Sequence, residues 1–332
     1  MTCKSFRLPI LKLILNLFLV LWSFAAYSQQ YAIVDQTVKS YPKAFASPQK
    51  LAEKINADFA KEEDKVRAIF TWMALNIQYD LAFYASQRSN PTNAYSFSSE
   101  EDRIQKEQKF KSDAANKTLR SKKGVCQDYA ALFQTLCELM KIQCTTIIGK
   151  SKNDLSLIGR FAKFNDHAWN AVKIGNAWRL LDVTWAAGAL NSQTQKMEQL
   201  FNDGYFFSSP EVFFLNHFPE DKQWLFLNKT ESDFADLPLY YGGYIKAQYQ
   251  FITPLNGLFS KTNTQKIMFK AINFPENYKV AYVFSSEGQL REVAAVHQGN
   301  TAQFEVILGK KSRGYLTIYV NNESIVSYKI VP

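Results

Sequence analysis

Cysteine and histidine are scarce in this sequence, which holds four cysteines and three histidines in 332 residues. These numbers exclude a zinc-finger array and a disulfide-stapled scaffold. With only 13 glycines and 10 prolines, collagen-like and low-complexity chains are excluded as well. Any chemistry that pairs a thiol with an imidazole must therefore use one of twelve possible Cys/His combinations.

The sequence also lacks a run of lysine and arginine interleaved with aromatic residues, and it has no helix-turn-helix, zinc-finger or RNA-recognition pattern. Its 39 basic and 30 acidic side chains give a net charge of +9 that is spread along the chain. We therefore expect no nucleic-acid partner. What is present is 47% hydrophobic residues, enough for packed cores, and a length that favours two domains.

The first 28 residues are typical of a secretory signal peptide. A basic start is followed by an apolar run and by small residues at Ala26 and Ser28, which predicts cleavage after Ser28. The protein would then be secreted or periplasmic. A membrane partner is expected only if this segment stays uncleaved, and its unbroken apolar stretch is shorter than the ~20 residues of a spanning helix. The mature chain keeps three cysteines: Cys126, Cys137 and Cys144. The last two lie in apolar surroundings in the sequence and are expected to be buried.

Two amphipathic helices are predicted between Ser47 and Ile77. Ser47 followed by Pro48 is a favourable helix start, and apolar residues recur with helical spacing on either side of a charged break at residues 61–65. Residues 86–123 are polar with mixed charge. We expect an exposed excursion with short helices there, which is either a solvated loop or a lid near a site.

Beyond Asp236 the pattern changes to short β runs separated by Gly, Asn and Pro. They span residues 244–251, 266–272, 279–284, 303–308, 314–320 and 324–331. This alternation predicts an antiparallel, immunoglobulin-like β-sandwich. The chain is thus expected to be α+β, with a signal peptide (1–28), a mixed helix-and-strand domain (29–235) and a sandwich (236–332).

A cysteine opens the helix that is predicted to follow Gly124. Apolar residues downstream define the buried face of this helix, and Cys126 lies on that face. Free N–H groups and the positive end of the dipole at a helix start stabilise a thiolate, which would make Cys126 a nucleophile. The backbone N–H groups of Cys126 and Gln127 could also bind an oxyanion. A cysteine on a helix face is otherwise most often a small core residue.

Two strand-like runs, residues 166–174 and 177–184, flank Gly175-Asn176, which is a strong hairpin signal. If Ile174 pairs with Ala177, His167 and Asp182 become diagonal neighbours on one face, within reach of an imidazole–carboxylate hydrogen bond. Asp182 would then hold the tautomer of His167 and stabilise its imidazolium, as the third member of a triad does.

These residues resemble the transglutaminase-like superfamily. The resemblance lies in Gly124-Val125-Cys126, His167-Ala168-Trp169-Asn170 and Leu181-Asp182-Val183-Thr184-Trp185. His217-Phe218-Pro219 and the β-rich tail point to the branch that resembles kyphoscoliosis peptidase. The resemblance covers about residues 60–230 and implies a papain-like core with the Cys on a helix and the His and Asp on adjacent strands.

The resemblance implies that Cys126 is the nucleophile, His167 the general base and acid, and Asp182 the orienting carboxylate. The implied chemistry is acyl transfer on peptide or protein amides through a thioester, with water or an amine as acceptor. Trp169 and Trp185 are candidates for a substrate groove, although aromatic residues in strands more often serve packing.

No cofactor or metal is expected. His217 and His297 have no second His or Cys at ligand spacing. Asp166 is a weaker candidate than Asp182 for the orienting carboxylate, because it lies on the opposite strand face from His167. The sequence thus predicts an exported thiol enzyme that hydrolyses or cross-links peptide or protein amides, with a cell-envelope component as one candidate substrate. The alternative is a cell-envelope binding or scaffold module that keeps the fold without turnover.

Overall fold

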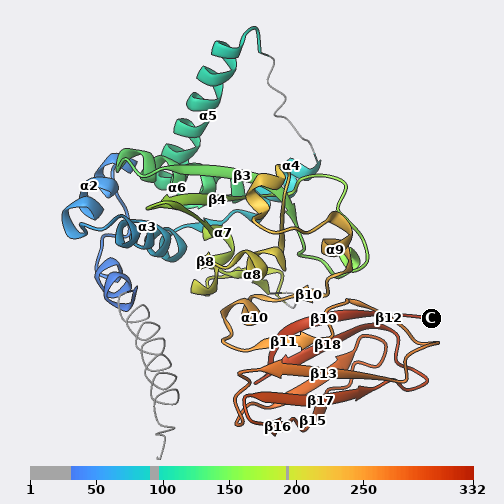
Figure 1. Cartoon of the computed structure of the whole chain (residues 1–332). Helices are drawn as coiled ribbons and strands as arrows, with labels where there is room; N and C mark the ends of the chain where they lie inside the picture. The colour runs from blue at the N-terminus through green and yellow to red at the C-terminus, as the bar shows by residue number, and fades with distance from the viewer. Residues whose placement is uncertain (1–30, 90–96, 192–193) are drawn as a thin grey trace, which may run out of the picture.

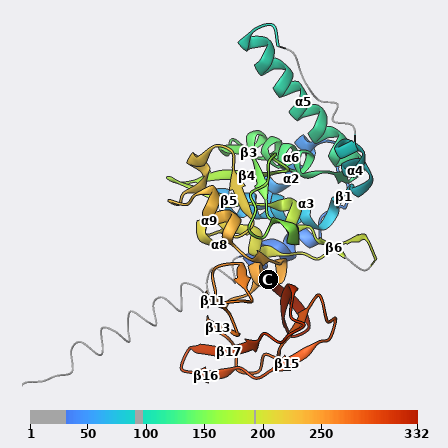
Figure 2. The ribbon, with the colours of Figure 1, turned by 90° about the vertical axis from the view of Figure 1, so that its right-hand side faces the viewer.

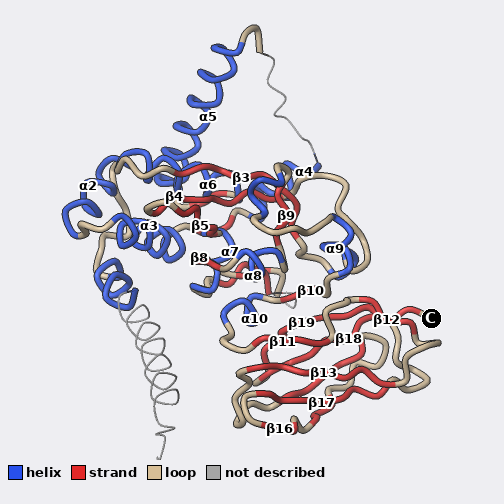
Figure 3. Tube along the Cα trace, in the orientation of Figure 1, coloured by secondary structure: helices blue, strands red, loops and turns tan. Residues whose placement is uncertain are grey.

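The computed structural model describes residues 31–89, 97–191 and 194–332 (Figure 1). The predicted signal peptide lies outside these residues. Within them, no helix combines the length and the apolar character that a membrane crossing requires. Helices surround a first sheet, and the C-terminal part consists mainly of strands (Figure 3), so the predicted α+β fold is confirmed.

The two predicted N-terminal helices are α2 (Pro48–Asp58) and α3 (Glu62–Asn76). Ser47 caps α2, because its side chain accepts a hydrogen bond from the backbone N–H of Lys50. The break between the helices is shorter than expected and ends at Lys61, the N-cap of α3. Both helices contact α6 (Cys126–Leu139), the central helix of this half.

The polar excursion is not a set of short helices, and that expectation is wrong. After α4 (Leu81–Ser89), a single helix of 22 residues, α5, runs over Glu100–Ser121. Ion pairs within it support the helix, such as those of Arg103 with Glu100 and Glu107. The last two turns of α5 are buried against α6, and the other end projects from the body of the protein (Figure 1, Figure 2).

A five-stranded sheet with the strand order β8-β5-β4-β3-β9 packs against α6. Its strands are β3 (Cys144–Ser151), β4 (His167–Ile174), β5 (Ala177–Leu181), β8 (Phe206–Ser208) and β9 (His217–Pro219). All neighbouring pairs are antiparallel. Consequently, β4 and β9 begin, and β5 terminates, at the same end of the sheet.

The predicted hairpin register is confirmed. Ile174 pairs with Ala177, and the pairing continues in the same register as far as Asn170 opposite Leu181. Gly175 has a positive φ of 57°, which a side chain would disfavour at this turn. The register of β4 and β5 therefore follows from the turn.

Short elements connect these larger ones. They are β1 (Gln78–Tyr79), β2 (Lys123–Gly124), α7 (Val183–Ala186), β6 (Ala189–Asn191), β7 (Lys196–Glu198), α8 (Pro210–Phe214), α9 (Glu231–Asp236) and three 3-10 turns, Leu155–Leu157, Asp203–Tyr205 and Lys222–Leu225. Residues 31–39 are helical as well.

The C-terminal part has two sheets. Their orders are β10-β19-β18-β14-β15, with β12 beside β19, and β11-β13-β17-β16. The strands are β10 (Leu239–Tyr240), β11 (Gln250–Thr253), β12 (Leu258–Ser260), β13 (Lys266–Ile272), β14 (Val280–Phe284), β15 (Arg291–Val293), β16 (Val296–Gln298), β17 (Thr301–Ile307), β18 (Gly314–Val320) and β19 (Glu323–Val331). Five of the six predicted β runs are therefore strands.

The first predicted run, residues 244–251, is wrong in its first half. Gly242–Lys246 forms a short helix, α10, and β11 begins only at Gln250. The physical reason is a buried contact, since the Tyr244 hydroxyl accepts a hydrogen bond from the Phe251 N–H at 3.0 Å. A strand through Tyr244 would carry its side chain away from this donor.

The two halves meet along β10. The side-chain amide of Asn216, just before β9, donates to the Tyr240 carbonyl at 3.0 Å. Buried Lys152 donates from Nζ to the Ala235 carbonyl at 3.1 Å and so anchors the segment that leads into β10. The strand-rich part thus lies next to β9, whose first residue belongs to the site described next (Figure 3).

Candidate active site

Cys126 is the first residue of α6, as the sequence predicts. The N-cap residue is Val125, whose backbone N–H donates to the carboxylate of Asp128 at 2.9 Å. The other N–H groups of the first turn have no partner inside the helix. These groups and the helix dipole create a positive potential beside the thiol, which is 6% exposed.

The approach of the chain to Cys126 is fixed by the parallel pair β1 and β2. The Asp80 N–H donates to the Gly124 carbonyl at 2.9 Å. A Cβ atom at Gly124 would lie 2.7 Å from the Cβ of Asp128, so a larger residue does not fit. Glycine is therefore required for α6 to begin directly after β2.

His167 and Asp182 meet at the end of the sheet where β4 starts and β5 terminates. His167 Nε2 lies 2.6 Å from Asp182 Oδ2, and both side chains are buried. The other oxygen, Oδ1, accepts a hydrogen bond from the Trp185 N–H at 3.1 Å, so Asp182 caps α7. The expectation that the strand continues to residue 184 is wrong, because this cap turns the chain into a helix.

His217 joins this pair from β9. Its Nε2 lies 3.0 Å from the same oxygen, Asp182 Oδ2, and the side chain is 1% exposed. β9 reaches this point because it is antiparallel to β3, which is itself antiparallel to β4. The sequence alone does not place His217 in the site, and the signal for it is the motif His217-Phe218-Pro219.

Burial and charge act in opposite directions on this group. Burial alone would raise the pKa of Asp182, but the rings of His167 and His217 overcome it and hold the pKa well below its usual range. Burial alone would lower the pKa of His167, but the Asp182 carboxylate and Cys126 raise it overall. The pKa of His217 is lowered, first by burial and further by the charge of His167. At neutral pH, His167 is thus the charged imidazole and His217 the neutral one.

The orientation of the His167 ring decides which nitrogen serves the thiol. Because Nε2 donates to Asp182, Nδ1 is the nitrogen left for Cys126, which lies close enough to His167 to help to raise its pKa. The structure therefore brings together a thiol at a helix start, an imidazole and an orienting carboxylate. This arrangement is suited to nucleophilic acyl transfer.

The two tryptophans predicted to bind substrate both lie beside His167. Trp185 stacks on the His167 ring with centroids 5.1 Å apart and is half-buried. Trp169 is 2% exposed and packs between His167 and Phe213. Trp185 thus has surface left for a ligand, while Trp169 supports the His167 ring. Their role in substrate binding stays a prediction.

Asp166 makes different contacts from Asp182. Its Oδ1 accepts a hydrogen bond from the Ser151 N–H at 2.7 Å, and its Oδ2 accepts from the Ser151 hydroxyl at 2.8 Å. These bonds tie the start of β4 to the end of β3. Asp166 therefore connects two strands, whereas Asp182 is the carboxylate that contacts His167.

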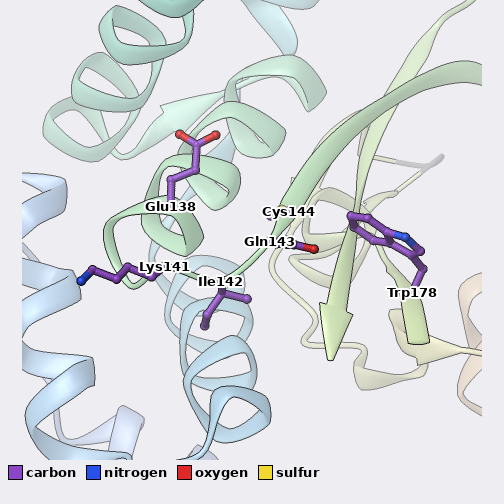
Figure 4. A pocket seen from close by; sticks show the side chains of 6 residues that line it. All are labelled: Glu138, Lys141, Ile142, Gln143, Cys144 and Trp178. Carbon is purple, nitrogen blue, oxygen red and sulfur yellow. The ribbon is translucent and has the colours of Figure 1, made fainter. Parts of the chain in front are cut away.

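The other two described cysteines lie toward the far end of α6. Cys137 is fully buried, whereas Cys144 is half-buried, so the expectation that both are buried holds for Cys137 only. Cys144 lines a cavity of about 490 Å³ together with Glu138 and Trp178 (Figure 4). Burial raises the pKa of the Cys144 thiol, and the neighbouring Cys137 adds to this effect.

Iodoacetamide is expected to alkylate Cys126 faster than Cys144 at neutral pH by roughly tenfold or more, although Cys144 is the more exposed thiol. Cys126 has the helix start and the imidazolium beside it, whereas the raised pKa of Cys144 keeps that thiol protonated. Mass spectrometry of proteolytic peptides measures both rates. Equal or faster labelling of Cys144 would contradict the assignment of Cys126 as the nucleophile.

The side-chain N and O atoms of His167, Asp182 and His217 lie within 4.8 Å of one another, a spacing at which three residues could share a metal ion. Both ring nitrogens are at hydrogen-bond distance from one carboxylate oxygen, which fits two N–H donors. A zinc ion would instead need unprotonated nitrogens at ~2.0–2.1 Å. In the described part of the chain these three residues therefore fit a hydrogen-bonded group better than an ion site.

The stability of the protein should depend on pH through His167. Its pKa is raised by folding, so the stabilisation is complete below the ordinary value of 6.5 and is lost as the pH rises through the folded value. In Cys126→Ala, which removes the thiol from the titration, the free energy of unfolding should fall above neutral pH by up to about 1.4 kcal/mol per pH unit. Urea unfolding at several pH values measures this slope. Adding His167→Gln should abolish it, and an unchanged slope would refute the assignment.

Comparison with known protein families agrees with this geometry. Residues 49–183 match the family model described as the transglutaminase-like superfamily. This stretch is therefore similar to the transglutaminase-like superfamily, and Cys126, His167 and Asp182 all lie within the matched residues. The resemblance that the sequence motifs predict is confirmed.

The chain is similar to kyphoscoliosis peptidase from Homo sapiens, with 37% identity over 170 residues that cover 51% of this chain and 22% of that protein. Hillarin from Drosophila melanogaster is 29% identical over 136 residues, which cover 36% of this chain and 16% of hillarin. This chain thus spans about a fifth of the length of these relatives. Among solved structures, a TGase crystal structure matches with a TM-score of 0.29 and 16% identity, covering 56% of this chain and 42% of that one.

Proposed function

We propose that this protein is a thiol enzyme that transfers acyl groups from peptide or protein amides. The observation that supports it most is the 2.6 Å contact between His167 Nε2 and Asp182 Oδ2, which leaves Nδ1 for the thiol at the start of α6. This order of thiol, imidazole and carboxylate supplies a nucleophile, a base and an orienting group.

In the proposed reaction, the Cys126 thiolate attacks the amide carbonyl carbon and the carbonyl oxygen takes up the electron pair. The backbone N–H groups of Cys126 and Gln127 are the proposed donors to this oxyanion. His167 then gives its Nδ1 proton to the departing amine as the C–N bond breaks, leaving a thioester on Cys126. Water or an amine, deprotonated by His167, attacks the thioester and releases the thiolate.

We place hydrolysis before transfer to an amine. Water is present at any open site, and the relative with 37% identity carries the name of a peptidase. We further propose that the protein is exported and acts on peptides or proteins outside the cytoplasm, with a component of the cell envelope as a candidate substrate. The sequence of residues 1–28 supports the export proposal.

One observation favours the alternative of a binding module without turnover. Cys126 is 6% exposed and His167 is 7% exposed, so little of either side chain faces solvent. An enzyme would have to admit an extended peptide to the side chains of Cys126 and His167, whereas a scaffold would not.

Trapping of the thioester distinguishes the two functions. The protein is incubated with a library of peptide amides, quenched in acid and examined by intact mass. The proposed enzyme gains the mass of the acyl group on Cys126 and loses it in hydroxylamine, which cleaves thioesters. No adduct with any peptide, together with unreactive Cys126 in the iodoacetamide experiment, would favour the binding module.

A further inference from the structure

His217 is a buried titratable residue to which the mechanism above gives no task. Its Nε2 and that of His167 both lie at hydrogen-bond distance from Asp182 Oδ2, at 3.0 and 2.6 Å. We propose that His217 is a positioning residue, the second donor that fixes Asp182 Oδ2 and so holds His167 in the tautomer and orientation that Cys126 requires. This inference rests on the proposed function and adds a residue to it.

The hydrogen bonds of the Asp182 carboxylate support this role. Asp182 is 0% exposed, so its oxygens depend on protein donors. The Trp185 N–H donates a hydrogen bond to Oδ1, and the two imidazoles donate to Oδ2. These donors come from α7, β4 and β9, and three bonds in different directions prevent rotation of the carboxylate. Without His217, the Trp185 N–H and His167 would still hold the carboxylate, but Oδ2 would lose its donor that is independent of His167.

The His217 ring is itself held rigidly. Phe213 stacks on it with centroids 4.0 Å apart, and Trp185 and Trp169 lie at 4.6 and 5.0 Å. The backbone of His217 pairs with Ser151 of β3. Its Nδ1 lies 3.2 Å from the Phe213 carbonyl, which can only accept, so the neutral ring with its proton on Nε2 makes no hydrogen bond there and is held by packing. A ring enclosed on several sides presents its Nε2–H in one direction, as a pre-organised donor should.

Burial lowers the pKa of His217 overall and keeps it a neutral donor, although the Asp182 carboxylate acts in the opposite direction. The titratable groups that face it are Asp182, His167 and the Tyr205 ring, whose centroid lies 6.2 Å away. Because the two imidazoles share one carboxylate, a charge on His167 disfavours a second charge on His217. The negative charge of Asp182 is thus available to the imidazolium of His167.

His217 acts through Asp182 and not on the reacting atoms. Its Nε2 is directed to the carboxylate, and the two imidazole centroids lie 5.4 Å apart. The role is therefore distinct from that of a second base. Loss of the donor should weaken the thiolate–imidazolium pair while leaving the thiol in place.

Two substitutions separate the donor from the ring. His217→Phe keeps an aromatic ring against Phe213 and removes the N–H, whereas His217→Gln places an amide N–H near the position of Nε2. The rate of alkylation of Cys126 by iodoacetamide is measured in the full chain from weakly acidic to alkaline pH. This probe needs no knowledge of the natural substrate.

At neutral and weakly acidic pH, His217→Phe should lower the alkylation rate about tenfold or more, and His217→Gln should stay within about threefold of the unchanged protein. Well above the ordinary thiol pKa of ~8.5, the thiolate forms without help from His167, so the three rates should converge. Equal losses in both variants at every pH would mean a merely structural role and overturn the inference. So would an unaffected His217→Phe.

The unchanged protein provides a second readout if His217→Phe does not fold. The chain has three histidines, so nuclear magnetic resonance of ¹⁵N-histidine can assign each ring. His217 should be a neutral Nε2–H tautomer at neutral pH, and an Nδ1–H tautomer or zinc-induced shifts from metal binding at low zinc concentration would overturn the proposal. An unreactive Cys126 in the unchanged protein would refute the proposed function itself, whereas a reactive Cys126 that is insensitive to the loss of the donor refutes this inference alone.

Discussion

Replacing Cys126 by serine should reduce acyl-enzyme formation and amide turnover by at least about a thousandfold. A serine hydroxyl is far less acidic than a thiol, so the His167 imidazolium cannot hold it as an anion. The substitution is nearly isosteric at a side chain that is 6% exposed, so the fold should be unaffected. Amine release from a peptide that forms the thioester adduct measures the effect.

Cys144→Ser is the matched control for this experiment. Cys144 is half-buried beside a cavity that is lined by none of the three triad residues, so its loss should leave turnover close to that of the unchanged protein. A Cys126→Ser protein that keeps a tenth or more of the activity would refute the nucleophile assignment. Equal losses in both variants would point to a general effect on the fold.

Asp182→Asn should have the largest effect of any change that leaves the thiol intact. An asparagine keeps the size of the side chain, but it has no negative charge to hold the His167 imidazolium. If its oxygen caps α7, its NH2 group faces His167 and His217 and cannot accept a hydrogen bond from either. Loss of the correct tautomer in a triad lowers turnover by about 10⁴-fold. The rate of amine release and the alkylation rate of Cys126 should both fall.

Asp166→Asn is the control, since Asp166 precedes His167 but bonds to Ser151. An asparagine there keeps one acceptor for the Ser151 N–H, so turnover should change by no more than about threefold. If Asp166→Asn proved the more damaging substitution, the carboxylate assignment would have to move to Asp166.

The parts of the site that could be predicted from the sequence are those fixed by local rules. The helix start at Cys126 follows from an apolar stripe and from Gly124, and the approach of His167 to Asp182 follows from a two-residue turn. In both cases residues close in sequence set the geometry. The hairpin register, once the turn is known, places two side chains correctly without any knowledge of the remaining fold.

His217 could not be placed in this way. It is separated from Asp182 by 35 residues, and no hairpin connects them. Its position depends on the pairing of β9 with the far side of β3, which is a tertiary choice without a local signal. The long helix α5 has no clear sequence signal for a different reason, since its exposed part carries ion pairs and lacks an apolar stripe, and buried residues lie in its last two turns.

The double duty of Asp182 has a consequence for protein engineering. Removal of a residue from an active site often stabilises an enzyme, because such sites sacrifice stability for activity. Here one carboxylate starts α7 and also joins β4 to β9. Asp182→Ala should therefore cost several kcal/mol, as breaking a buried ion pair does (about 3–5 kcal/mol). Directed evolution toward heat resistance should therefore retain Asp182 even when selection for activity is relaxed. Cys126 is the better residue to replace when an inactive but stable protein is wanted.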